Sequence, residues 1–211
     1  MPPEEAASAG RRLARRALEL PELARARTVA AYVSVGREPG TREVLESLRA
    51  RGTAVLLPVL LADGDLDWAE YGGPDALRPA GRGLLEPAGP RLGPAAVRAA
   101  EAVLLPGLAV DGRGLRLGRG GGSYDRVLAR LAGEGAPAGG GPAGGGPAGG
   151  VPSDSVPSGG VRSGGGSSGG GPALVVLLYD GEVLDHVPAE PHDRPVTAAV
   201  TPSAVHRFPR P

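Results

Sequence analysis

Residues 28–61 read TVAAYVSVGREPGTREVLESLRARGTAVLLPVLL, and this stretch decides the fold. Its first eight residues form an apolar run of β-rich composition that a Gly- and Pro-containing turn at 36–40 ends. Residues 41–50 follow with Val44, Leu45 and Leu48 at helical spacing, and Thr41 is expected to cap that helix. Residues 54–61 form a second apolar run. A strand, a helix and a strand in this order are typical of a crossover unit on a parallel sheet.

The same alternation continues through the rest of the chain. It predicts helices at residues 11–20, 95–100 and 124–131, and strands at 66–71, 102–105 and 173–179. Residues 66–71 are expected at an edge of the sheet. The pattern therefore predicts an α/β fold with three layers, in which helices cover both faces of a mostly parallel, Rossmann-like sheet.

Composition excludes several kinds of function. The 23 basic residues, all of them arginines, balance 23 acidic residues, so no overall charge favours nucleic acid or an anionic membrane. Without cysteine the chain has no disulfide, thiolate metal site or cysteine nucleophile. No apolar stretch has the length of a membrane span or of a signal peptide. We expect a cytoplasmic monomer without nucleic-acid or membrane partners.

A Gly/Pro/Ser-rich stretch at residues 133–172 interrupts the domain. It holds almost no large apolar side chain, so burial cannot offset the entropy of ordering it. We expect a disordered loop inserted into a single domain made of residues 1–132 and 173–211.

Residues 115–131, LRLGRGGGSYDRVLARL, combine three consecutive glycines with arginines and a following helix. Glycines let backbone amides curl toward an anion, a helix N-terminus adds positive potential, and Arg116 and Arg119 can grip phosphate oxygens. The Gly-Lys-Ser/Thr ending of a Walker loop is absent. Asp125 is equally well explained as an acid that the helix dipole stabilises or as a ligand of the Mg²⁺ that accompanies ATP.

Residues 106–126, PGLAVDGRGLRLGRGGGSYDR, resemble the signature of 5-formyltetrahydrofolate cyclo-ligases. The resemblance continues in AAYVSVGREPGTREVL, AVLLPVL and GLLEP upstream and in VPAEPHDRPVTAAVT downstream. It implies closure of a reduced formyl folate, 5-formyltetrahydrofolate, to 5,10-methenyltetrahydrofolate with consumption of ATP and with Mg²⁺.

The resemblance also implies roles for individual residues. The ATP loop is matched by Arg116, Leu117, Gly118, Arg119, Gly120, Gly121, Gly122, Ser123 and Tyr124, of which Arg119 and Tyr124 are the expected catalytic residues. Folate contacts are matched by Val33, Glu38 and the stretch Arg119 to Ser123, and the magnesium ligands by Asp125 and Asp193.

Three features depart from the family pattern. Ser123 and Thr197 stand where the family has an aromatic residue and often an aspartate, respectively. Family members also begin with a basic helix that reaches the ATP phosphates, and the arginines at 11–16 lie too close to the first strand to match it. We therefore expect weak ATP binding from this chain. A binding homologue without turnover and an interaction protein that uses the 133–172 loop are the alternatives.

Overall fold

In the computed structural model, which describes residues 2–133, 171–190 and 193–209, the described residues form a seven-stranded sheet in the order β12-β11-β9-β6-β1-β2-β3. The pairs within β11-β9-β6-β1-β2 are parallel, and β3 and β12 join the two edges antiparallel. The strands are β1 (Thr28–Ala30), β2 (Ala54–Leu60), β3 (Leu66–Glu70), β6 (Ala102–Leu105), β9 (Ala173–Leu177), β11 (Ala198–Val200) and β12 (Val205–Arg207). The predicted α/β class and the edge position of residues 66–71 are confirmed.

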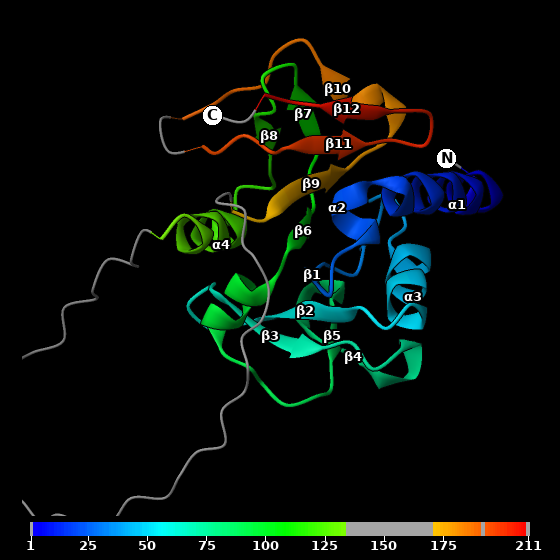
Figure 1. Cartoon of the computed structure of the whole chain (residues 1–211). Helices are drawn as coiled ribbons and strands as arrows, with labels where there is room; N and C mark the ends of the chain where they lie inside the picture. The colour runs from blue at the N-terminus through cyan, green and yellow to red at the C-terminus, as the bar shows by residue number, and fades with distance from the viewer. Residues whose placement is uncertain (1, 134–170, 191–192, 210–211) are drawn as a thin grey trace, which may run out of the picture.

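Helices cover both faces of this sheet (Figure 1). The helices α1 (Pro3–Glu19), α2 (Pro21–Ala24) and α3 (Arg42–Ala50) pack on one face, and α4 (Ser123–Leu131) and the 3₁₀ helix η3 (Pro94–Ala99) pack on the other. Successive residues of a strand alternate between the two cores, as Leu104 and Leu105 of β6 do. The long apolar runs of the sequence reflect burial on both sides.

Two small β structures lie outside the main sheet. One contains β7 (Ala109–Asp111), β8 (Arg116–Leu117) and β10 (Val183–Leu184), and the other is the hairpin of β4 (Leu77–Pro79) and β5 (Leu85–Pro87). The 3₁₀ helices η1 (Pro74–Ala76), η2 (Gly81–Gly83) and η4 (Asp180–Glu182) complete the described elements. None of these short elements was predicted, because strands of two or three residues show no recognisable periodicity.

The first helix is longer than predicted. It begins at Pro3 rather than at residue 11, with a proline in its first turn and Glu4 and Glu5 at its positive end. The apolar face that marked residues 11–20 covers only the part of α1 that packs on the core, where Leu13 and Ala17 are fully buried. Similarly, the short helix predicted at 95–100 is the 3₁₀ helix η3. No helix in the described ranges is long and apolar enough to cross a membrane.

The segment after β1 also differs from the prediction. The strand ends at Ala30 rather than at residue 35, and the Thr41 hydroxyl does not cap α3. Instead Thr41 Oγ1 accepts a hydrogen bond from the Ser34 amide at 2.9 Å, and the Thr41 amide donates to Ser34 Oγ at 3.2 Å. This reciprocal pair closes residues 34–41 into a loop at the carboxyl end of β1.

Candidate active site

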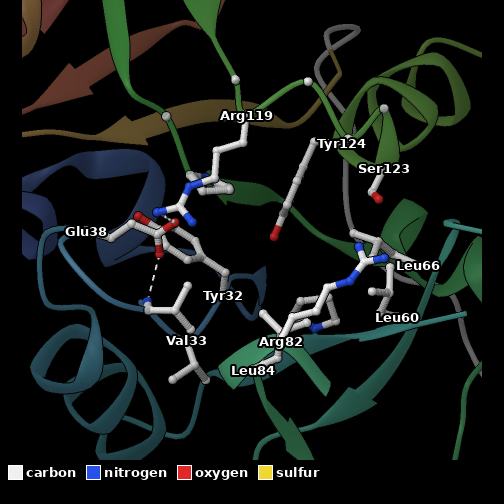
Figure 2. A pocket seen from close by; sticks show the side chains of 18 of the residues that line it. Tyr32, Val33, Glu38, Leu60, Leu66, Arg82, Leu84, Arg119, Ser123 and Tyr124 are labelled. Atoms are coloured by element: carbon white, nitrogen blue, oxygen red, sulfur yellow. Dashed lines mark hydrogen bonds and ion pairs between the residues drawn. The ribbon is translucent and has the colours of Figure 1, made fainter. Parts of the chain in front are cut away.

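A pocket with a volume of about 320 Å³ lies beside the carboxyl ends of β1, β2 and β6. In open α/β sheets this is where ligands bind. Its walls come from the glycine loop and from the segment after β1, and Figure 2 shows side chains from both pointing into it. The lining residues are Tyr32, Val33, Val35, Glu38, Pro58, Leu60, Leu66, Arg82, Leu84, Leu85, Glu86, Pro106, Gly107, Arg116, Gly118, Arg119, Gly120, Gly121, Gly122, Ser123, Tyr124 and Asp125.

Most of the predicted site residues meet in this pocket. The loop residues Arg116 and Gly118 to Asp125 line it together with Val33 and Glu38. Leu117 is not a lining residue; it pairs with Ala109 in β8, next to Arg116 of the same strand. Asp193 is not a lining residue either, although it lies close enough to influence the pKa of Arg116.

The glycine loop leads directly into α4. Gly122 is the N-cap of that helix and has a φ of 70°, a left-handed conformation that favours glycine. No side chain caps this end of α4, so its first amides and its positive dipole end remain available to an anion. Asp125 lies in the first turn of α4, as its interpretation as an acid that the helix dipole stabilises requires.

Arg116 is a buried cation at the base of the loop. Its side chain is 7% exposed, donates to the Pro106 carbonyl at 3.1 Å and pairs with Asp125 at 3.3 Å. Burial lowers the pKa of Arg116, whereas Asp125, Tyr124 and Asp193 act in the opposite direction. Its Nε has no hydrogen-bond partner among the described residues, which leaves a buried donor for an anionic ligand.

Arg119 pairs with Glu38 across the pocket at 3.1 Å (Figure 2). The other carboxylate oxygen of Glu38 accepts a hydrogen bond from the Val35 amide at 2.8 Å. The Glu38 side chain is only 9% exposed, whereas that of Arg119 is 57% exposed. The carboxylate is therefore fixed by the 34–41 loop, and the arginine is the partner that can move.

Two tyrosines place hydroxyl groups near this ion pair. Burial raises the pKa of both Tyr32 and Tyr124, so both hydroxyls stay protonated at neutral pH and can donate hydrogen bonds. The Tyr124 hydroxyl points into the pocket (Figure 2). The Tyr32 hydroxyl is buried and has no hydrogen-bond partner in the described part of the chain.

Two of the three departures from the family pattern, Ser123 and Thr197, have structural roles here. Ser123 Oγ donates to the Gly64 carbonyl at 2.7 Å and joins the start of α4 to the turn between β2 and β3. Thr197 Oγ1 donates to the Leu174 carbonyl at 2.8 Å and accepts from the Leu174 amide at 3.0 Å. Thr197 thus holds the entry of β11 against β9.

The arginines of α1 lie elsewhere. Arg11 and Arg15 line a separate groove with Glu43 and Arg51 of the α3 region, and Arg16 donates to the Pro202 carbonyl at 3.0 Å. Among the described residues of α1, none lines the pocket at the glycine loop.

Sequence reasoning missed one wall of the pocket. The β4–β5 hairpin contributes Arg82, Leu84, Leu85 and Glu86, and Tyr32 was interpreted only as part of a strand. The resemblance block GLLEP contains three of these residues and was the available signal, but it carried no assigned role.

The 5-formyltetrahydrofolate cyclo-ligase family model matches residues 1–138, more than half of the chain. The chain is 35% identical over 181 residues to a 5-formyltetrahydrofolate cyclo-ligase of Mycolicibacterium smegmatis, covering 83% of this chain and 74% of the relative. The chain belongs to this family. Within the cyclo-ligase family, a second relative is the Escherichia coli K12 cyclo-ligase, 32% identical over 128 residues, covering 60% of this chain and 70% of that protein.

Solved structures from the same family share the fold. The 5,10-methenyltetrahydrofolate synthetase of Aquifex aeolicus superimposes with a TM-score of 0.70 at 21% identity, covering 100% of this chain and 87% of that one. The synthetase of Mycoplasma pneumoniae gives a TM-score of 0.60 at 14% identity, covering 96% and 90%. The cyclo-ligase family is one of ligase-class enzymes, and the architecture of this chain is that of its solved members.

Proposed function

We propose that this chain converts 5-formyltetrahydrofolate to 5,10-methenyltetrahydrofolate, with conversion of ATP to ADP and phosphate. One observation carries the proposal beyond family membership. The pocket joins a phosphate-type glycine loop, with two arginines and an uncapped helix end, to a fixed carboxylate and two tyrosine hydroxyls. A nucleotide and a pterin require these two sets of groups side by side.

The proposed reaction transfers the γ-phosphoryl group of ATP to the formyl oxygen of the folate. The 10-nitrogen then attacks the formyl carbon, and the carbon–oxygen bond breaks as phosphate leaves with the proton of the 10-nitrogen. The substrate supplies both the nucleophile and the electrophile, so the protein acts by positioning and by neutralising charge.

The proposed role of each pocket residue in binding the two ligands follows from its position in the pocket. The loop amides, Arg116 and Arg119 would bind the phosphates, and Glu38 would accept hydrogen bonds from the donor edge of the pterin. The Tyr124 hydroxyl, held protonated and aimed into the pocket, would donate to an oxygen between the two ligands. Val33 and Leu84 would contact the flat faces of the pterin.

Two carboxylates near Arg116 have the chemistry of magnesium ligands, Asp125 in the pocket lining and Asp193 outside it. Asp125 and Asp193 both lie near Arg116, and the described residues hold no larger cluster of acidic or histidine side chains. Mg²⁺ keeps several waters and needs only one or two protein carboxylates, so these two would hold it. Bound there, the ion would neutralise and orient the phosphates.

Formation of the methenyl product, which absorbs in the near ultraviolet, tests the proposal directly. Product should form only when ATP, magnesium and 5-formyltetrahydrofolate are all present, and Arg116→Gln should abolish it. Arg98→Gln, a change in η3 outside the pocket, is the matched control and should leave the rate unchanged. Binding of both ligands without product would instead identify a homologue that has lost turnover, the alternative suggested by Ser123.

A further inference from the structure

Three arginines line the pocket, and only Arg82 has no ion-pair partner within the described ranges. Arg116 pairs with Asp125 and Arg119 with Glu38. The nearest acid in sequence, Glu86, accepts a hydrogen bond from the Leu60 amide at 3.0 Å and lies 3.9 Å from Arg91. Arg82 therefore brings an uncompensated positive charge to the pocket.

The backbone at Arg82 is strained. Its φ is 61° and its ψ is 24°, and it is the single non-glycine residue with a positive φ in the described part of the chain. This left-handed conformation costs a side-chain-bearing residue about 1–2 kcal/mol, although glycine would adopt it freely. Strain that persists at a pocket wall points to a function for the side chain that glycine could not perform.

The Arg82 side chain points in a different direction from the groups assigned to phosphate. Arg82 extends away from the Glu38–Arg119 pair, toward the side of the pocket where Leu66 and Ser123 lie (Figure 2). The residue is exposed, so it lies at the mouth of the pocket rather than at its base. The wall around it includes apolar side chains, with Val33 on the side of Glu38 and Leu60 beside Leu66 (Figure 2).

We propose that Arg82 binds the glutamyl carboxylate end of the folate and selects for that negative charge, an inference that rests on the proposed function. A reduced folate has a pterin at one end, an apolar aromatic linker and a charged glutamate at the other. Its carboxylates are costly to desolvate and should stay near solvent, whereas the pterin can enter the pocket. The pocket offers a partner for each part: Glu38, apolar lining residues, and an exposed arginine for which the described residues hold no ion-pair partner.

The test compares two forms of the substrate on three proteins. Affinities for 5-formyltetrahydrofolate and for its neutral glutamyl diamide are measured with the wild type, with Arg82→Gln and with Arg78→Gln. Arg78 is an exposed arginine on the same hairpin that does not line the pocket. The wild type and Arg78→Gln should prefer the diacid about tenfold, a typical effect of one charge-assisted hydrogen bond, and Arg82→Gln should lose most of that preference.

A second measurement separates binding from folding and from the nucleotide. Arg82→Gly, which relieves the positive φ, should melt at the same or a higher temperature while losing the preference for the diacid. ATP affinity should be unchanged in both variants. Equal wild-type affinity for diacid and diamide overturns this inference alone, as does a loss of ATP affinity in Arg82→Gln, which would assign the cation to phosphate. A wild type that binds neither folate overturns the proposed function as well.

Discussion

Substitution of Glu38 by glutamine should affect the two proposed ligands in opposite directions. The Glu38–Arg119 ion pair joins the carboxylate assigned to the folate to a cation assigned to ATP, so the pair must open when both ligands bind. Glutamine keeps the size of the side chain and an oxygen for the Val35 amide, but it removes the charge that holds Arg119. Arg119 is then released to the phosphates.

The expected change in ATP affinity follows from the exposure of the Arg119 side chain. Because the Arg119 side chain is 57% exposed, the net strength of the pair is that of a surface ion pair, about 0.5–1 kcal/mol. ATP should therefore bind about two- to fivefold more tightly to Glu38→Gln than to the wild type. Folate loses a charge-assisted hydrogen bond to a buried carboxylate. Such a bond contributes about 1.5–3 kcal/mol, so folate should bind at least tenfold more weakly.

Isothermal titration with a non-hydrolysable ATP analogue and magnesium measures the first effect, and titration with 5-formyltetrahydrofolate measures the second. In the wild type each ligand should also increase the affinity for the other, because either one breaks the same ion pair, and this coupling should vanish in Glu38→Gln. Arg119→Gln is the matched control: it should lose both the coupling and ATP affinity. Weaker ATP binding by a normally folded Glu38→Gln protein would refute this reasoning.

Three further changes probe the metal, the fold and the insertion. Asp125→Asn should leave the melting temperature nearly unchanged but weaken ATP binding in the presence of magnesium, and an unchanged affinity there would contradict the ligand assignment. At Asp111, burial would raise the pKa, but bonds from Arg113 and from backbone amides outweigh it and leave that pKa lowered. The resulting stability is present above about pH 4 and is lost as the pH falls through the lowered pKa. Chemical denaturation of Asp111→Asn should therefore show about 2 kcal/mol less stability at pH 7 and a weaker loss of stability in acid. The same acid dependence in the variant and the wild type would count against this role of Asp111. We also propose that residues 134–170 can be replaced by a short Gly/Ser linker with little change in melting temperature, since the entropic cost of loop closure depends only logarithmically on loop length. Loss of the cooperative melting transition would show that the segment packs on the domain.

The sequence predicted those parts of the fold whose pattern is long or chemically distinctive. The apolar runs of β2, β6 and β9 are buried on both faces and could be recognised without their neighbours, and the glycine loop indicated the start of α4. The loop at 34–41 could not be predicted in the same way. Its shape depends on the bonds between Ser34 and Thr41, which compete with strand extension and with helix capping.

Most residues that line the candidate site could be predicted from the sequence, but the ion pairs between them could not. Composition and spacing indicated phosphate binding, and the family resemblance was needed to select Glu38 and Asp193. Neither source indicated that Arg119 would pair with Glu38, because an ion pair across a pocket leaves no local pattern. Arg82 was missed because its hairpin has strands of three residues and its conformation runs against the preference of its residue type.

The direction of α4 has a consequence for engineering. The helix starts at the pocket and ends near the opposite end of the sheet, where Arg98, just before β6, donates to the Arg130 carbonyl at 3.3 Å. The chain returns at Ala173, which pairs with Ala102 at the first residue of β6. Both borders of the undescribed residues 134–170 thus lie at the end of the domain remote from the chemistry. A reporter domain or an affinity tag spliced between them would be displayed far from the ligands, which makes this junction the natural place for a fusion that preserves binding.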